Sequence, residues 1–417
     1  MRGRFEPPGD KSVGHRLALL SAIAHGRSRL EGFAPGDDCG STVGVVRALG
    51  VPAIRDGDSV EIEGRGYWGL TAPERDLDAG NSGSTARMAC GILSAQRFDS
   101  RVVGDESLSR RPFERVVRPL NEMGGRLTTE GGHLPVTIKG GRKLAGIDYE
   151  LPVPSAQVKT AILLAGLYAE GTTTVRERLP SRNHTEIALA AFGAPPLVTD
   201  GRVQVRGGTP LTAGRFRLPG DFSTAAFFIA GAAFLQGSEV VIENVGFNRT
   251  RAAFLEVLKD MGADVEIEPS KNAEGREPVG AVTVRGRPLS GTVVPRDNVP
   301  AVIDEIPILA VVAANAEGET RVEGAAELRV KESDRLEAIL KGLRALGADV
   351  EALDDGFVVR GRAKLAPARL ESFGDHRMVM AWAIAALGVD GDCVIDHLDQ
   401  VRISYPGFWR TLDELIH

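Results

Sequence analysis

The sequence predicts an α/β fold of two similar domains, each made of three copies of one βαβαββ-like unit. Its 417 residues exceed what one ordinary hydrophobic core holds, so two domains are expected. A hydrophobic content of 43% with 25% charged residues is typical of a globular protein. A polar turn, an apolar helix, a strand, a second helix and alternating strands recur along the chain at a spacing of about 70 residues, which indicates an internal repeat.

The second helix of each of the first five units is predicted to end at a glycine. Glycine suits this position because the residue after a helix often adopts a left-handed conformation. A strand of alternating polar and apolar residues follows each helix end. The five helix ends are Leu49-Gly50-Val51, Met123-Gly124-Gly125, Phe192-Gly193-Ala194, Met261-Gly262-Ala263 and Leu346-Gly347-Ala348, and the strands begin near Val60, Pro135, Val203, Ala281 and Phe357.

The first helix of each unit starts with a polar residue. Because free backbone N–H groups and the positive end of the helix dipole meet at a helix start, such positions bind anions. If the starts face one another across a cleft, that cleft prefers anions. The six starts lie near Asp10, Asn81, Ser155, Asp221, Asp304 and Asp375.

The sixth copy lacks its closing pair of strands. We expect the segment 2–8 to supply one missing strand, so that the domain holding both termini is discontinuous. That domain is predicted to comprise residues 1–10 and 217–417, with residues 11–216 inserted as the other domain. Two crossover segments at these boundaries would join the domains.

Composition excludes several classes of protein. A net charge of −6 argues against a general nucleic-acid binder. Cys39, Cys90 and Cys393 match no zinc spacing, and so sparse a set suits a reducing compartment. The first residues hold no apolar signal region, and the apolar stretch 303–315 is too short to span a bilayer. We expect a cytoplasmic monomer that contacts neither nucleic acid nor membrane.

Basic and hydroxyl side chains occur at helix starts in the N-terminal half. The segment from Lys11 to Arg16 places an ammonium, a hydroxyl and a guanidinium within one turn, as a phosphate or carboxylate site requires. A serine cap with two solvated cations explains the same residues. The segment from Asn81 to Arg87 contains Gly83, which would let a ligand approach the backbone closely.

Three further segments of this half carry candidate binding groups. Arg111 precedes a proline and a helix, where a guanidinium can fork onto an anion. Ser155, Gln157 and Lys159 open the third unit with a hydroxyl, an amide and an ammonium, although helix capping alone accounts for the serine. The segment 182–186 has no metal-ligand spacing and is typical of a surface turn.

Carboxylates appear at helix starts in the C-terminal half. Asp304 begins a strongly apolar helix, where the dipole favours its ionised form and nearby cations would hold it as a base. A plain acidic cap is the alternative. In the run that follows the next strand, Lys331, Glu332 and Arg335 can be presented together, whereas such a charge run is often a solvated face.

The sixth unit begins with Asp375, His376 and Arg377. The aspartate can orient a neighbouring group, and the arginine can reach an anion. The histidine stands at the repeated site position, although a lone histidine is more often a structural partner. Cations at so many equivalent turns of an acidic protein predict a ligand with several phosphate or carboxylate groups.

Taken in order, these motifs resemble the 5-enolpyruvylshikimate-3-phosphate synthases, and more closely their second, bacterial class. The resemblance runs from residue 7 to about residue 380, close to the whole chain. The motifs that carry it are Gly9-Asp-Lys11-Ser12-x-x-x-Arg16, Gly80-Asn81-x-Gly83, Arg111-Pro112, Ser155-Ala156-Gln157, Arg182-Asn-His-Thr-Glu186, Asp304-Glu305-x-Pro307, Arg329-Val-Lys331-Glu332-Ser-Asp-Arg335 and Asp375-His376-Arg377.

The resemblance implies two inside-out α/β barrel domains with the active site in the cleft between them. It implies transfer of the enolpyruvyl group of phosphoenolpyruvate to the 5-hydroxyl of shikimate-3-phosphate, with release of phosphate, in chorismate biosynthesis. Asp304 would take the proton from that hydroxyl. Glu332, with Lys331 or Lys11, would protonate the methylene carbon to give a tetrahedral intermediate. No metal or organic cofactor is implied.

Two sets of binding residues follow from the same resemblance. For shikimate-3-phosphate they are Lys11, Ser12, Arg16, Ser155, Ala156, Gln157, Arg182, Asp304 and Lys331. For phosphoenolpyruvate they are Lys11, Asn81, Gly83, Arg111, Gln157, Arg335 and Arg377. Supporting residues are Arg87, Asp375 and His376.

The sequence departs from the family pattern near its C-terminus. The family often has a lysine before a Ser/Thr-Phe-Pro segment, whereas this chain has Ile403 before Ser404-Tyr405-Pro406, and Arg402 is the candidate replacement. At the glycine of the second motif, Gly83 leaves room beside phosphoenolpyruvate that an alanine would fill. We therefore expect inhibition by glyphosate.

Three other functions remain open from the sequence. The UDP-N-acetylglucosamine enolpyruvyl transferases share the fold, but they have Lys-Asn where this chain has Lys11-Ser12, and usually a cysteine in the loop before Arg111-Pro112. An RNA 3′-phosphate cyclase relative would need a nucleotide motif or a basic stripe, and neither is visible. A non-catalytic anion-binding protein would gain nothing from Asp304 and Glu332.

Overall fold

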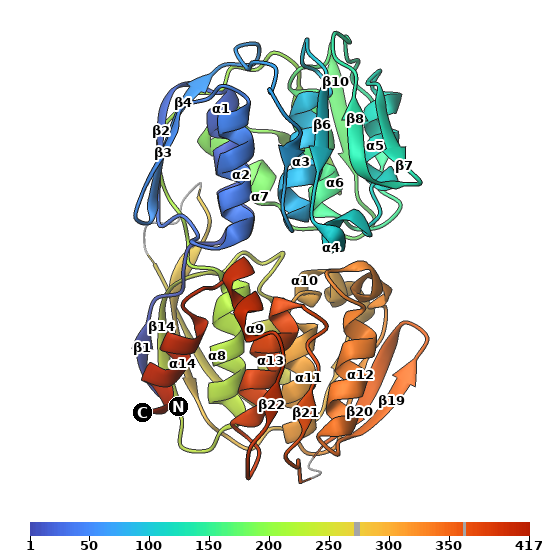
Figure 1. The fold of residues 1–417 in the computed structure, drawn as a ribbon. Helices are drawn as coiled ribbons and strands as arrows, with labels where there is room; N and C mark the ends of the chain where they lie inside the picture. The colour runs from blue at the N-terminus through green and yellow to red at the C-terminus, as the bar shows by residue number, and fades with distance from the viewer. Residues whose placement is uncertain (271–275, 362–363) are drawn as a thin grey trace. The chain divides into compact units, whose positions relative to one another are not determined.

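A computed structural model describes residues 1–270, 276–361 and 364–417 (Figure 1). The chain divides into two compact units, and each is described by itself. Unit 1 consists of Met1–Pro8, Pro219–Ala273 and Pro278–His417, and unit 2 consists of Gly9–Leu218 with Glu274–Glu277.

In the described residues, unit 2 contains three four-stranded sheets with the same strand order. In each, an edge strand runs parallel to its neighbour, and the next two strands are antiparallel. The sheets are β13-β2-β4-β3 (Arg215–Arg217, His25–Glu31, Ser59–Arg65, Ala53–Asp56), β5-β6-β8-β7 (Leu77–Asp78, Ser100–Val103, His133–Ile138, Leu127–Glu130) and β9-β10-β12-β11 (Asp148–Glu150, Thr172–Arg176, Arg202–Arg206, Leu197–Thr199).

Unit 1 repeats this order in its described part and ends with a shortened copy. Two sheets have four strands, and the last is a parallel pair. The six predicted units are therefore confirmed. The sheets are β1-β14-β16-β15 (Arg2–Phe5, Glu239–Gly246, Val279–Arg285, Asp264–Pro269), β17-β18-β20-β19 (Val293–Val294, Glu319–Val322, Gly356–Arg360, Asp349–Leu353) and β21-β22 (Arg369–Leu370, Val394–Ile395).

The prediction that segment 2–8 completes the sixth copy is wrong. Strand β1 is instead the parallel edge of the fourth copy, with Arg2 opposite Glu239. Strand β13 closes the first copy in the same way, with Arg215 opposite Arg29. A short alternating strand fits any open edge, so its partner depends on packing far away in the sequence.

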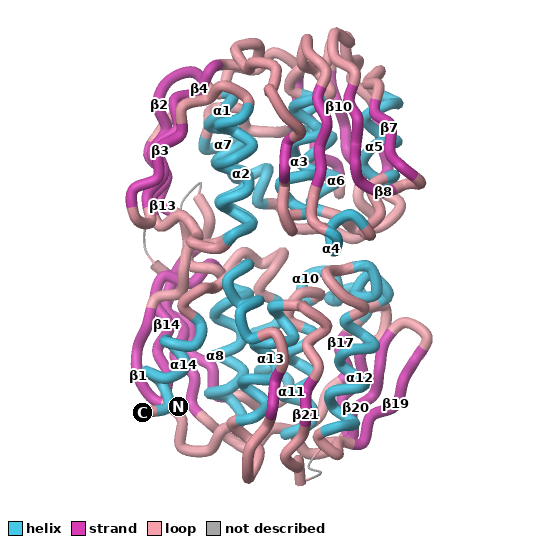
Figure 2. The backbone as a smooth tube through the Cα atoms, viewed as in Figure 1, coloured by secondary structure: helices cyan, strands magenta, loops and turns pink. Residues whose placement is uncertain are grey.

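The first helix of each copy lies inside its unit, with the sheets outside, as Figures 1 and 2 show for each unit separately. These helices are buried almost all round, as expected for helices without a polar face. All thirteen residues of α8 are buried. The inner helices are α1 (Lys11–Ile23), α3 (Gly83–Leu93) and α6 (Ala156–Gly166) in unit 2, and α8 (Phe222–Phe234), α11 (Ile306–Asn315) and α13 (His376–Ala386) in unit 1.

Among the described residues, the second helices of the first five copies are more exposed, and each is followed by one of the predicted glycines. Gly50, Gly124, Gly193, Gly262 and Gly347 have φ between 78° and 102°, which confirms the predicted helix ends. These helices are α2 (Asp37–Ala48), α5 (Glu114–Glu122), α7 (His184–Ala191), α9 (Ala253–Asp260) and α12 (Arg335–Ala345), and the remaining helices are α4 (Glu106–Ser109), η1 (Arg296–Asn298), α10 (Val299–Val302), η2 (Ala326–Val330), η3 (Leu398–Ile403) and α14 (Phe408–Ile416).

Side chains cap most of the inner helices at their N-termini. A carboxylate or hydroxyl accepts a backbone N–H of the first turn in α1, α3, α6, α8 and α13, which satisfies a group that the helix leaves free. Each cap therefore fixes the position at which its inner helix begins. The capping residues are Asp10, Ser82, Ser155, Asp221 and Asp375.

Candidate active site

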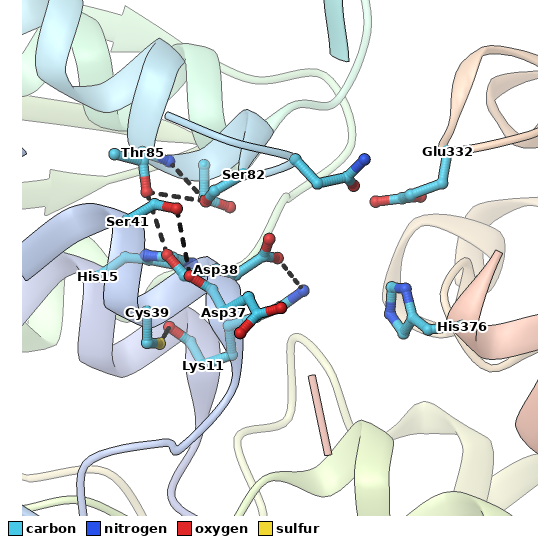
Figure 3. Close-up of polar contacts among 12 residues, drawn as sticks. Lys11, His15, Asp37, Asp38, Cys39, Ser41, Ser82, Thr85, Glu332 and His376 are labelled. Carbon is cyan, nitrogen blue, oxygen red and sulfur yellow. Dashed lines mark hydrogen bonds and ion pairs between the residues drawn. The ribbon is translucent and has the colours of Figure 1, made fainter. Parts of the chain in front are cut away.

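At the start of α1, Lys11 is held by a carboxylate. Its Nζ lies 2.7 Å from Oδ2 of Asp38 in the first turn of α2 (Figure 3). Asp37 and Asp38 both occupy that turn, where the helix dipole stabilises negative charge. The sequence reasoning missed Asp38, although two acidic residues after Gly36 are the signal of a helix start.

Arg16 lies inside unit 2 and ties three helix starts together. Its Nε donates to Oγ1 of Thr185 at 2.7 Å, and Nη1 donates to the Ser12 carbonyl at 2.7 Å. Its Nη2 donates to Oγ1 of Thr160 at 3.0 Å and to the Ala156 carbonyl at 3.4 Å. Burial is the main cause that lowers the pKa of Arg16 to about 10, so the guanidinium stays charged at neutral pH.

Arg87 connects α3 to the start of α6. Its Nη1 donates to Oε1 of Gln157 at 2.7 Å, and its Nη2 donates to the Pro112 carbonyl at 3.2 Å. The guanidinium carbon also lies 4.8 Å from the centre of the Phe113 ring, a cation–π contact. Nε2 of Gln157 donates to Oγ of Ser84 at 3.0 Å, so the amide orientation is set from both ends.

Arg111 and Asn81 form the neighbouring part of the site. Nη2 of Arg111 donates to Oδ1 of Asn81 at 2.8 Å, and Nδ2 of Asn81 donates to Asp105 at 2.8 Å. Gly83 lies directly beside both guanidiniums. A Cβ atom added there would come within 2.7 Å of Nη1 of Arg87 and 3.4 Å of Nη1 of Arg111, so only glycine leaves the Arg87 guanidinium in its place.

The third unit adds Ser155 and Arg182. The hydroxyl of Ser155 caps α6 by accepting the N–H of Val158, as the capping interpretation predicted. Arg182 is partly exposed in the segment between β10 and α7. Its charge is one of the causes that lower the pKa of Arg16. Unit 2 thus collects the predicted basic, amide and hydroxyl groups of the N-terminal half.

In unit 1, Asp304 lies among three cations. Its Oδ1 is 3.7 Å from Nζ of Lys331 and 3.4 Å from Nη1 of Arg335, and its Oδ2 is 3.7 Å from Nη2 of Arg377. Nη1 of Arg377 also donates to the Asp304 carbonyl at 3.2 Å. Positive charges on several sides favour an ionised carboxylate at the start of α11.

Arg335 is the centre of a buried charge cluster. Its Nε donates to Asp375 at 2.7 Å and its Nη2 to Glu332 at 2.6 Å, while the side chain is 1% exposed. Burial would lower the pKa of Arg335, but Asp375, Glu332 and Asp304 outweigh burial and raise it. Arg335 at the end of the charge run is therefore buried in a charge cluster, whereas Arg329 at its start is exposed.

His376 is almost completely buried in unit 1. It is 1% exposed, and its Nδ1 lies 3.9 Å from Asp375. Arg377, the next residue, remains 7% exposed. Within the described residues, no group of three or more His, Cys, Asp or Glu side chains is arranged to hold a metal ion. No helix in the described part of the chain is long and apolar enough to cross a membrane.

The fold is that of the enolpyruvyl transferases. The enolpyruvyl transferase NikO from Streptomyces tendae superimposes with a TM-score of 0.77 at 18% identity, covering 99% of this chain and 94% of the other. At this identity the likeness concerns the fold alone.

Sequence comparison defines the family. Residues 1–412 match the family model described as EPSP synthase (3-phosphoshikimate 1-carboxyvinyltransferase). A 3-phosphoshikimate 1-carboxyvinyltransferase of Solibacter usitatus is 48% identical over 99% of this chain and 97% of its own length. A solved EPSP synthase from Acinetobacter baumannii superimposes with a TM-score of 0.88 at 43% identity, covering 99% of this chain and 95% of that one. The chain belongs to the EPSP synthase family.

Proposed function

We propose that this protein transfers the enolpyruvyl group of phosphoenolpyruvate to the 5-hydroxyl of shikimate-3-phosphate and releases phosphate. Family membership supports the reaction. The observation that carries the chemistry is Asp304, a carboxylate with three cations within 3.7 Å. Such surroundings keep it ionised at neutral pH, as a general base must be.

In the first step, the 5-hydroxyl oxygen of shikimate-3-phosphate attacks C2 of phosphoenolpyruvate, and Asp304 accepts the proton of that hydroxyl. Glu332 donates a proton to the methylene carbon, with Lys331 or Lys11 as alternative donors. The resulting tetrahedral intermediate then loses phosphate: Glu332 takes a proton back from the methyl carbon, and Asp304 gives its proton to the departing phosphate. Each proton-transfer group contributes roughly 10²–10⁴ in rate.

The binding groups are divided between the two units. We propose that the ligands bind in an interdomain cleft to which both units contribute. The cations orient the two anions and stabilise the charge that develops in the transition state. The proposed shikimate-3-phosphate set is Lys11, Ser12, Arg16, Ser155, Ala156, Gln157, Arg182, Asp304 and Lys331, and the phosphoenolpyruvate set is Lys11, Asn81, Gly83, Arg111, Gln157, Arg335 and Arg377.

Arg16 has a particular place in the first of these sets. Its N–H groups already hold carbonyl and hydroxyl oxygens at the starts of three helices. We therefore assign it to fixing the positions of Ser12 and Ala156, while its charge attracts the acceptor. We also propose that the protein acts as a cytoplasmic monomer, in keeping with cysteines that form no disulfide.

The test is phosphate release by the purified protein. Phosphoenolpyruvate is supplied with shikimate-3-phosphate or with UDP-N-acetylglucosamine, and Asp304→Asn and Glu332→Gln are assayed beside the wild type. Release only with shikimate-3-phosphate, reduced about 10²–10⁴-fold in each variant, supports the proposal. Release only with the nucleotide sugar would assign the chain to the sister activity, and release with neither acceptor would refute the proposed reaction.

A further inference from the structure

Lys159 is a buried ammonium held by two carboxylates of unit 2. Its side chain is 1% exposed, and Nζ lies 2.8 Å from Oε2 of Glu177 and 2.7 Å from Oε1 of Glu186. Moving three charged groups out of water is costly, and their mutual attraction offsets that cost only where the geometry is good. An apolar side chain in place of Lys159 would avoid the cost, so the buried charges indicate a role beyond packing.

Glu177 also closes the loop that follows β10. Its Oε1 accepts the backbone N–H of Ser181 at 3.1 Å and the hydroxyl of the same residue. Nζ of Lys159 lies 3.5 Å from the Ser181 carbonyl. Both ends of the loop, Glu177 and Ser181, therefore contact the Lys159 ammonium. Arg182 is the next residue after this loop.

The same ammonium joins the elements that carry the proposed shikimate-3-phosphate residues. Lys159 lies three residues after Ala156 and two after Gln157 in α6. Glu186 lies on α7 next to Thr185, whose hydroxyl accepts a hydrogen bond from Arg16. A shift of Lys159 would move the start of α6, the loop and the start of α7 relative to one another.

Charge balance gives a second reason for these carboxylates. Arg16 and Arg182 repel one another, and after burial itself the charges of Glu186, which raises the pKa of Arg16, and of Arg182, which lowers it, are the next largest influences. Lys159 adds another positive charge in the same part of unit 2. Glu177 and Glu186 offset these charges, which reduces the repulsion among the cations before an anion binds.

From these contacts we propose that Lys159, Glu177 and Glu186 are positioning residues for Arg182. They set the affinity for the phosphate-bearing acceptor without touching it. The proposal rests on the proposed function, because that function places the acceptor's phosphate at Arg182. It concerns binding only and adds no chemical step.

The main test is the variant Glu177→Gln. A glutamine has one amide oxygen, so if that oxygen accepts from Ser181, the amide NH₂ faces the Lys159 ammonium as donor against donor. We expect KM for shikimate-3-phosphate to rise about ten- to a hundredfold, as misplaced binding groups cause. KM for phosphoenolpyruvate should change less than about twofold. Equal increases in both KM values would overturn the proposal.

A double-mutant cycle with Arg182→Ala shows whether Glu177 acts through Arg182. If it does, adding Glu177→Gln to Arg182→Ala changes KM for shikimate-3-phosphate by less than about twofold, because the group it positions is gone. Fully additive effects would overturn the proposal. The matched control is Glu150→Gln, which removes a carboxylate that pairs with Arg178 of the same loop in an exposed position, and its KM values should match those of the wild type.

A readout without substrate separates this proposal from the proposed function. Trypsin cleaves after Arg178 and Arg182, so nicking of the folded protein between α6 and α7 reports opening of the loop. Nicking should be faster in Glu177→Gln and in Ser181→Ala. The second variant keeps the ion pairs of Lys159, so it tests the loop even if Glu177→Gln misfolds. Faster nicking with no turnover in the wild type would refute only the reaction, and unchanged nicking in both variants would refute the positioning role.

Discussion

Nε of Arg335 donates to Oδ2 of Asp375 across 2.7 Å, and both side chains are buried inside unit 1. Asp375 also caps α13 by accepting the N–H of Arg377 at 2.9 Å. The Asp375 carboxylate therefore holds Arg335 of α12 and also caps α13, the helix that carries Arg377. Burial would raise the pKa of Asp375, but the Arg335 guanidinium outweighs it, so the pKa lies below its usual value.

Asp375→Asn should destabilise unit 1 by about 3–5 kcal/mol, because it leaves a buried guanidinium with less compensating charge. Since the pKa of Asp375 is lower in the folded state, its contribution is present above pH 3.8 and is lost as the pH falls further. Urea unfolding of the wild type and variant at pH 7 measures the difference. Equal midpoints would contradict the assigned role.

Gly83→Ala should weaken phosphoenolpyruvate binding. The added methyl would lie 2.7 Å from Nη1 of Arg87 and 3.4 Å from Nη1 of Arg111, so at least the first guanidinium must move. We expect KM for phosphoenolpyruvate to rise about tenfold and inhibition by glyphosate to weaken. Wild-type turnover that persists at millimolar glyphosate would refute the expected inhibition, and Gly44→Ala, where a Cβ meets nothing within 4 Å, is the control.

His15 makes stability depend on pH. Burial first, then the charges of Lys11 and Arg16, lower its pKa well below 6.5, so the folded protein holds the ring neutral. Below pH 6.5 the unfolded chain gains a proton that the folded chain does not. Stability is therefore lost as the pH falls, by about 1.4 kcal/mol between pH 7.5 and 5.5.

The measurement for His15 compares urea unfolding of the wild type with His15→Asn at both pH values. The asparagine keeps a polar atom near Oγ1 of Thr42, which lies 2.6 Å from Nδ1 of the histidine. The variant should lack this part of the pH dependence, because it differs from the wild type only at residue 15. Identical pH dependence would show that His15 does not contribute.

The three cysteines should react in two groups. Cys39 and Cys90 are buried, and burial raises the pKa of the Cys90 thiol to about 12, which suppresses the reactive thiolate. Cys393 is partly exposed. A thiol reagent at pH 8 should modify one thiol per chain quickly and all three in guanidinium chloride, and Cys393→Ser should abolish the fast phase. Two fast thiols would contradict the burial.

Local patterns were enough to predict the repeat and the helix starts. Glycines such as Gly193 and alternating strands such as the one at Val203 depend on neighbours in sequence, so the six units followed from them. The partner of β1 could not be predicted in this way, because its pairing with β14 joins residues more than 200 positions apart. Asp38 was missed for the same reason, since its contact with Lys11 depends on how two helices pack.

The pairing of β1 with β14 also has a consequence for the order in which a growing chain folds. Residues 9–218 of unit 2 are contiguous, so nearly all strands and helices of that unit have left the ribosome when β13 emerges and can pair with one another. The first strand made must wait for residues 239–242, and its sheet is complete only after β16 has been synthesised. Synthesis from the N-terminus therefore lets the inserted unit fold first, while the earliest-made segment stays unpaired and open to chaperones.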